Sequence, residues 1–147
     1  MKKIILAMVA VMVPLMLSAG STDFWFRHFS VEDGLSSSAV RAIMQDTYGF
    51  MWLGTDDGLN RYDGTTIKIY RLNPEGVNDY ISFLYDTTDR IWIGTGDGVY
   101  IYDYETENFE PFKLLTAKGD SIKTNVNHIA EDRDGNLWFS TVGQGIF

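Results

Sequence analysis

Adjacent carboxylates are the residues of this sequence with the most obvious potential for chemistry. Asp56 and Asp57 form such a pair. Two carboxyl groups hydrolyse a glycosidic bond when they face each other across a sugar at a set separation. Neighbouring residues at the end of one strand point in different directions, so we expect no glycosidase site at this pair.

Other patterns that often carry chemistry are incomplete. The run Gly94 to Gly98 (GTGDG) lies between two predicted strands and lacks the helix and lysine of a phosphate-binding loop. The aspartate-rich turns do not have the spacing of a calcium-binding EF-hand. His28 has no partner in view, and the chain contains no cysteine. We therefore predict no catalytic residue, no metal site and no cofactor.

One segment recurs three times. It runs from Asp46 to Asp63 (DTYGFMWLGTDDGLNRYD), recurs from Asp86 to Asp103, and begins again at Asp132. Each copy opens with an aspartate that stands six residues before a tryptophan, at Trp52, Trp92 and Trp138. The tryptophans are 40 and then 46 residues apart. Repeats of this length are typical of β-propellers, in which each repeat forms one blade of four antiparallel strands.

The tryptophan strands are apolar on both faces. They read MWLGT from Met51, IWIGT from Ile91 and LWFST from Leu137. Continuous apolarity indicates a sheet that is covered on both sides, as blades of a propeller cover one another. We therefore expect the tryptophans to pack in the core and not to stack on sugars. The small residue two positions later (Gly54, Gly94 or Ser140) leaves room for a large ring of the adjacent unit.

The turns before these strands have a shared design. Asp46, Asp86 and Asp132 are expected to lock them by accepting hydrogen bonds from backbone N–H groups two or three residues on. Gly49, Asp89 and Gly135 occupy a position that favours a left-handed backbone. Positions that recur, and to which we assign a structural role, are Asp46, Gly49, Trp52, Gly54, Thr55, Gly58, Asp86, Trp92, Gly94, Thr95, Gly98, Asp132, Gly135, Trp138, Thr141 and Gly145.

The repeats set the predicted domain organisation, an all-β incomplete propeller. We assign residues 1–20 to a signal peptide, 21–39 to an outer strand and crossover, 40–79 to blade 1, 80–125 to blade 2 and 126–147 to part of blade 3. The aromatic run Asp23 to Phe29 is predicted to form a β-strand. In a closed propeller this strand would complete the last blade.

The first twenty residues are predicted to direct export. Lys2 and Lys3 precede an apolar run from Ile4 to Leu17, and small residues follow at Ser18 to Gly20. This is the layout of a cleaved signal peptide, and the run is shorter than the roughly 20 residues of a membrane span. Cleavage removes two lysines and takes the net charge from −8 to −10. Such a chain repels phosphate backbones, so we expect no nucleic-acid partner and no membrane contact after cleavage.

Three stretches resemble the two-component regulator propeller repeat. They are FSVEDGLS at Phe29 to Ser36, VRAIMQD at Val40 to Asp46, and GFMWLGTDDGLNRYDG at Gly49 to Gly64. The resemblance implies a periplasmic sensor region of a hybrid two-component system, followed by a membrane helix and a histidine kinase core. It also implies an oligosaccharide ligand and a homodimer. We then expect the chain to be an N-terminal piece of such a sensor, without catalytic activity of its own.

Two alternatives remain open at this stage. The chain could derive from a secreted propeller lyase or hydrolase that acts on polysaccharide, or from a truncated gene without activity. Propellers close with about four to eight blades. Two units and part of a third would leave blade faces uncovered, so we expect the isolated chain to be poorly soluble or self-associating. The sequence does not identify the sugar or the residues that contact it.

Overall fold

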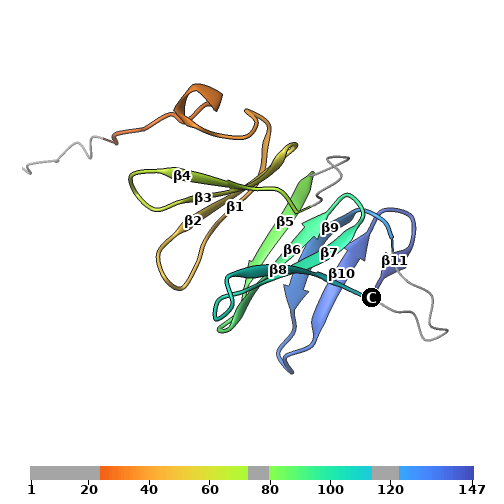
Figure 1. Ribbon diagram of the computed structural model, residues 1–147. Coiled ribbons are helices and arrows are strands. Elements are labelled where there is room, and N and C mark those ends of the chain that lie inside the picture. Colours follow the sequence, from red (N-terminus) through yellow and green to blue (C-terminus); the bar gives the residue numbers. More distant parts are fainter. Residues whose placement is uncertain (1–23, 73–79, 114–122) are drawn as a thin grey trace, which may run out of the picture.

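The computed structural model describes residues 24–72, 80–113 and 123–147, and within them the only helix is the short 3-10 helix Val31–Asp33. The predicted signal peptide and most of both predicted crossovers lie outside the described residues. The described strands form three antiparallel sheets that stand side by side without closing into a ring (Figure 1). The predicted all-β fold of four-stranded propeller blades is confirmed.

Each sheet is built from strands that follow one another in the chain. The first sheet has the order β1 (Val40–Gln45), β2 (Met51–Thr55), β3 (Gly58–Tyr62) and β4 (Ile67–Tyr70). The second has the order β5 (Ile81–Asp86), β6 (Arg90–Thr95), β7 (Gly98–Asp103) and β8 (Asn108–Phe112). The third contains β9 (Val126–Glu131), β10 (Leu137–Thr141) and β11 (Gly145–Ile146). Pro111 lies in the edge strand β8, where a missing N–H is tolerated.

The first strand of every sheet contains a β-bulge at the same place. Val40 pairs with Thr55 but Ala42 pairs with Gly54, which leaves Arg41 as the additional residue. The same irregularity occurs at Ser82 in β5 and at Asn127 in β9. Bulges bend and twist a strand, and they re-aim a side chain.

The core lies between the sheets. Between the first and second sheets, Trp52, Ile81 and Ile91 are fully buried, and the Trp52 ring centroid is 5.1 Å from that of Tyr102. We call this boundary the first seam. Between the second and third sheets, Trp92 packs with Val126, Ile129 and Phe139, and we call this boundary the second seam.

Two glycines permit the close approach of the sheets. A Cβ added to Gly54 would lie 2.6 Å from Ile81 Cγ2, and one added to Gly94 would lie 2.5 Å from the Val126 carbonyl oxygen. The small residues at these two positions therefore let the next unit approach closely, but the prediction that they make room for a large ring is wrong. The neighbour at each position is the first strand of the following sheet. Ser140, in the third sheet, is only partly buried.

Two sequence-based expectations are wrong. Residues 24–30 contain no strand, and Phe24, Trp25 and Phe26 are at least 77% exposed, because no partner strand pairs with this segment. Trp138 is 51% exposed, although we expected it in the core. No further sheet covers its outer face in the part of the chain that the structure describes.

We expect Gly94→Ala to lower the free energy of unfolding by about 2 kcal/mol. The new methyl group meets a backbone carbonyl in a packed seam, where overpacking typically costs about 1–3 kcal/mol. Urea denaturation of the whole chain measures the loss. The matched control is Ser140→Ala, at the same position of the third sheet, which should stay within about 0.5 kcal/mol. Equal stabilities of the two variants would contradict the role assigned to Gly94.

Candidate functional site

Asp46 organises the turn between β1 and β2. Its Oδ1 atom accepts hydrogen bonds from the backbone N–H groups of Tyr48 and Phe50, both at 2.9 Å. Its Oδ2 atom accepts from Trp52 Nε1 at 2.7 Å. Asp46 is 5% exposed and Trp52 is fully buried, so one carboxylate connects the turn to the core. Sequence reasoning identified the turn contacts in outline but missed the indole.

Asp132 makes the same contacts at the turn between β9 and β10. It accepts from the backbone N–H groups of Asp134 and Asn136, and from Trp138 Nε1 at 2.9 Å. The indole hydrogen bond and those from Asn136 lower the pKa of Asp132 to about 2, because each donor stabilises the charged carboxylate. Gly49 and Gly135 take the left-handed backbone that both turns require, with φ of +91° and +83°.

Asp86 departs from this pattern. Its hairpin is shorter by one residue and closes with a hydrogen bond from Thr87 N–H to the Arg90 carbonyl. Asp89 does not adopt the predicted left-handed conformation. Asp86 therefore belongs to strand β5, and its carboxylate does not lock its own turn. It accepts from Thr47 N–H of the first sheet and from the Tyr104 hydroxyl, both at 2.9 Å. Trp92 Nε1 is left buried without a partner among the described residues.

A second recurring contact, which sequence reasoning missed, lies at the opposite ends of the strands. Thr55, Thr95 and Thr141 donate their hydroxyl hydrogen bonds to the carbonyls of Gly58, Gly98 and Gly145, at 2.9, 3.1 and 2.8 Å. The signal was present in the sequence as a threonine three residues after each tryptophan, followed by a glycine three or four residues later. These contacts hold the β2–β3, β6–β7 and β10–β11 turns in place.

The N-terminal segment is attached to the first sheet by polar contacts. The fully buried Asn60 accepts from Ser36 N–H at 2.9 Å and donates to Ser36 Oγ at 2.8 Å. Ser36 Oγ also lies 2.8 Å from Thr55 Oγ1. The second unit has Tyr100 in place of Asn60, so repetition gave no indication of this network.

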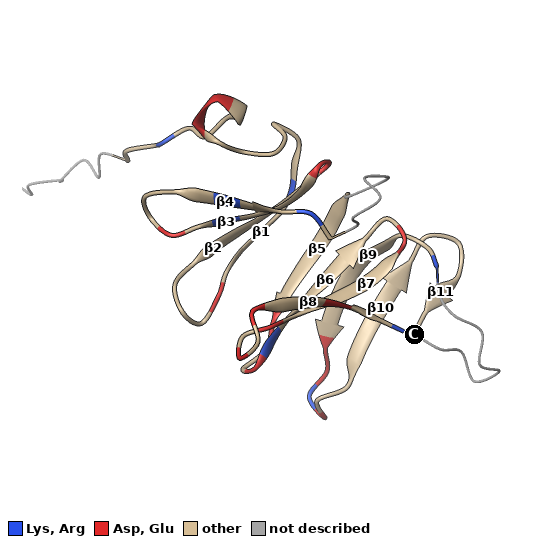
Figure 2. Ribbon diagram, viewed as in Figure 1, with Lys and Arg blue, Asp and Glu red and all other residues tan. Residues whose placement is uncertain are grey.

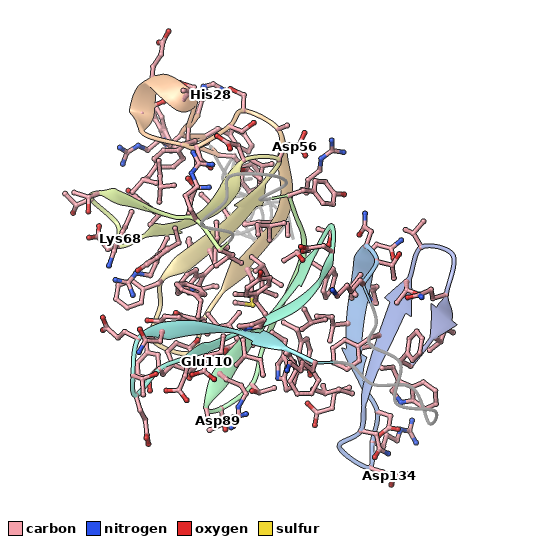
Figure 3. The ribbon with its side chains drawn as sticks, turned by 45° about the vertical axis from the view of Figure 1, so that its right-hand side comes forward. His28, Asp56, Lys68, Asp89, Glu110 and Asp134 are labelled. Carbon is pink, nitrogen blue, oxygen red and sulfur yellow. The ribbon has the colours of Figure 1, made fainter. Side chains whose placement is uncertain are left out.

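The carboxylates considered first for catalysis do not form a site. Asp56 accepts from Arg41 Nε at 2.7 Å, and Asp57 pairs with Arg71. Arg41 holds the pKa of Asp56 below its ordinary value. Asp56 lies at the opposite end of the sheets from Asp89 and Asp134 (Figure 3). In residues 24–72, 80–113 and 123–147, no cluster of three or more His, Asp or Glu side chains is placed to hold a metal ion.

The end of the sheets that carries the Asp46, Asp86 and Asp132 turns is the candidate site, and we call it the aspartate edge. Acidic residues recur along it (Figure 2). Three hollows lie on it, with volumes of about 190, 300 and 440 Å³. Tyr48 and Tyr104 line the first and second, and Thr88 and Asp89 line the second and third. Adjacent hollows share lining residues, and together they border both seams, so we call the three hollows the groove.

Comparison with known proteins bears on two stretches of the repeats. The family model described as "Two component regulator propeller" matches residues 34–57 and 121–143. These two stretches match the two-component regulator propeller repeat. Over 59 residues the chain is also 54% identical to histidine kinase P4 of Formosa agariphila, a match that covers 40% of this chain and 4% of that protein.

Solved structures of extracellular domains from two-component systems share the architecture. The extracellular domain of a putative hybrid two-component system of B. thetaiotaomicron is 30% identical, with a TM-score of 0.70, and the match covers 82% of this chain. The extracellular domain of a second such system from that organism is 22% identical, with a TM-score of 0.62, and the match covers 84% of this chain. This second likeness supports the fold and nothing further. The chain spans 18% of the length of each of these domains. Within its described residues, no helix has the length and apolarity to cross a membrane.

We expect Asp46→Ala to lower the free energy of unfolding by about 3 kcal/mol. The substitution leaves Tyr48 N–H, Phe50 N–H and the buried Trp52 Nε1 without acceptors, and each unsatisfied buried group costs about 1–3 kcal/mol. Urea denaturation monitored by tryptophan fluorescence measures the change. Asp132→Ala is the matched control, and it should cost clearly less because water reaches the exposed donors of that turn. An equal loss would show that burial of the indole is not the decisive factor.

Acid should release the Trp138 indole from Asp132 as the pH falls through about 2. The pKa of this carboxyl is about 2 in the folded chain and about 3.9 in an unfolded one. Its stabilising contribution is therefore complete above about pH 4 and is lost as the pH falls through 2. The Trp138 Nε1–H resonance, followed by NMR from pH 5 to acid, should titrate with a midpoint near 2. Trp138→Phe should move the Asp132 carboxyl midpoint upward, and an unchanged midpoint would refute the hydrogen bond as its main cause.

Proposed function

We propose that the chain is part of the ligand-sensing region of a two-component receptor and lies in the periplasm after export through residues 1–20. The observation that carries this proposal is the 30% identity and the TM-score of 0.70 to the extracellular domain of a putative hybrid two-component system. The complete receptor is a homodimer in this proposal, and its kinase is located elsewhere in the longer protein. The role of the chain itself is binding and not catalysis.

The proposed ligand is an oligosaccharide. The groove on the aspartate edge supports this class, because its three hollows share lining residues and so suit a molecule with repeated units. Its lining combines tyrosine rings with hydroxyl and carboxylate groups. Tyrosine offers an apolar ring with a polar end, and carboxylates accept hydrogen bonds from hydroxyl groups. No arrangement of side chains in the described residues favours the alternative, a polysaccharide lyase or hydrolase.

Deletion of the gene should abolish the transcriptional response to one class of polysaccharide and leave the responses to others unchanged. The receptor links ligand binding to gene expression, so only genes induced by its own ligand depend on it. Transcript profiles of parent and deletion strains, grown on single polysaccharides, measure this. The reading frame that encodes the chain should also encode a membrane helix and a histidine kinase core. Unaltered responses to every polysaccharide, or a frame without those modules, would reject the proposal.

A further inference from the structure

The first hollow on the aspartate edge has an unusual lining. Its residues come from both sides of the first seam: Tyr48, Phe50, Arg61, Tyr102, Tyr104 and Glu107. We infer that this aromatic hollow binds one uncharged sugar ring, and that the groove continues it as subsites for the rest of an uncharged oligosaccharide. This inference names the site and the charge class of the ligand, and it rests on the oligosaccharide proposed above.

Tyr48 supplies the exposed wall of the hollow. Its side chain is 64% exposed, and its ring centroid is 4.8 Å from that of Tyr104, across the first seam. Tyr104 is held in place, because its hydroxyl donates to Asp86, which also accepts from Thr47 N–H. A positioned ring beside an exposed ring presents an apolar surface to the C–H face of a sugar at low cost in side-chain entropy.

Arg61 supplies hydrogen-bond donors, most of which the described residues do not use. Its guanidinium carbon lies 4.7 Å from the Phe50 ring centroid, and Nη1 makes a single long hydrogen bond of 3.4 Å to the Tyr102 hydroxyl. The ion pairs of the described residues do not include Arg61. A guanidinium group carries five N–H donors, so most of them remain for the oxygens of a ligand.

The charges around the hollow select against ionic ligands. Aromatic rings around a cavity often bind a quaternary ammonium group, but here the Arg61 cation already occupies the face of Phe50 and would repel it. An anionic ligand would meet the carboxylate of Glu107 in the hollow and that of Glu131 in the third. In the second hollow it would meet Asp89, Asp103 and Glu105, which outnumber the one cation there, Arg90. A neutral ring avoids both penalties, and its hydroxyl groups accept from Arg61 and donate to Glu107.

The backbone at Glu107 is consistent with a dedicated position. Its φ is +53°, and it is the only described residue other than glycine with a positive φ. L-residues in this conformation pay a steric cost of about 1–2 kcal/mol, which glycine avoids. The charge of Glu107 also acts on the Tyr102 phenol, whose pKa is raised mainly by burial and further by this carboxylate. The carboxylate thus lies close to the inner wall of the hollow.

The dimensions favour a single ring in the hollow with more rings beyond it. At about 190 Å³ the hollow is smaller than the roughly 300–1,000 Å³ of pockets for drug-sized ligands. The second and third hollows, of about 300 and 440 Å³, extend it through shared residues. An oligosaccharide therefore fits the groove better than a free monosaccharide does.

Calorimetric titration of the complete chain with defined probes tests the inference. The uncharged probes are cellohexaose, laminarihexaose, maltohexaose, mannohexaose and xylohexaose, and the anionic probe is hexagalacturonate. At least one uncharged hexamer should bind, its monosaccharide should bind far more weakly, and hexagalacturonate should not bind. Tyr48→Ala should weaken binding about tenfold, the loss expected for one aromatic contact of about 1.4 kcal/mol. Glu107→Gln should weaken it several-fold.

Trp25→Ala is the matched control, since Trp25 is an exposed aromatic residue that lines none of the three hollows. It should leave the affinity unchanged, and circular dichroism should show all variants to be folded. Binding of a hexamer with equal affinity to wild type, Tyr48→Ala and Glu107→Gln would overturn the site but leave the proposed function standing. Preference for hexagalacturonate would overturn the charge class. Failure of every probe to bind the folded wild-type chain would overturn the inference, while the deletion strain tests the receptor function independently.

Discussion

The structure depends on the need to cover both faces of every sheet. The middle strands are apolar on both sides, so a single sheet would expose two hydrophobic faces to water. Trp52 shows how this constraint is met: the indole is fully buried, packs against Tyr102 of the next sheet and donates to Asp46 of its own turn. One side chain thereby joins a turn, a strand and the neighbouring sheet. The exposed face of Trp138 is the same surface without a neighbour.

The second unit exchanges a local hydrogen bond for a contact between sheets. Asp86 leaves Trp92 Nε1 unsatisfied, and an unpaired buried donor costs about 1–3 kcal/mol. In return its carboxylate joins Thr47 of the first sheet to Tyr104 of the second. These residues border the groove, so the departure from the repeat lies where we place the ligand. Because the copies differ here, the first seam has a lining that the second seam lacks.

Periodicity carried most of the fold information in the sequence. The apolar runs around Trp52, Trp92 and Trp138 predicted β2, β6 and β10 closely, because burial on both faces leaves a strong signal. Features that depend on the partner strand or sheet were not predictable in the same way. Residues 24–30 have the composition of a strand but no strand to pair with. The different role of Asp86 followed from a hairpin shorter by one residue, and the equivalent spacing of the three aspartates concealed it.

The candidate site was less accessible to sequence reasoning than the fold. The aromatic hollow combines Tyr48 and Arg61 of one unit with Tyr102, Tyr104 and Glu107 of the next. None of these was singled out by a motif, because the site lies between repeats and a motif search reads along them. The bulges at Arg41, Ser82 and Asn127 bear on this geometry. Arg41 lies over the Tyr80 ring, and Ser82 donates to the Val126 carbonyl, so each of these two reaches the start of the following sheet. In these two units the residue that the bulge re-aims therefore contacts the next unit, so the placement of one sheet beside the next depends on contacts between neighbours alone.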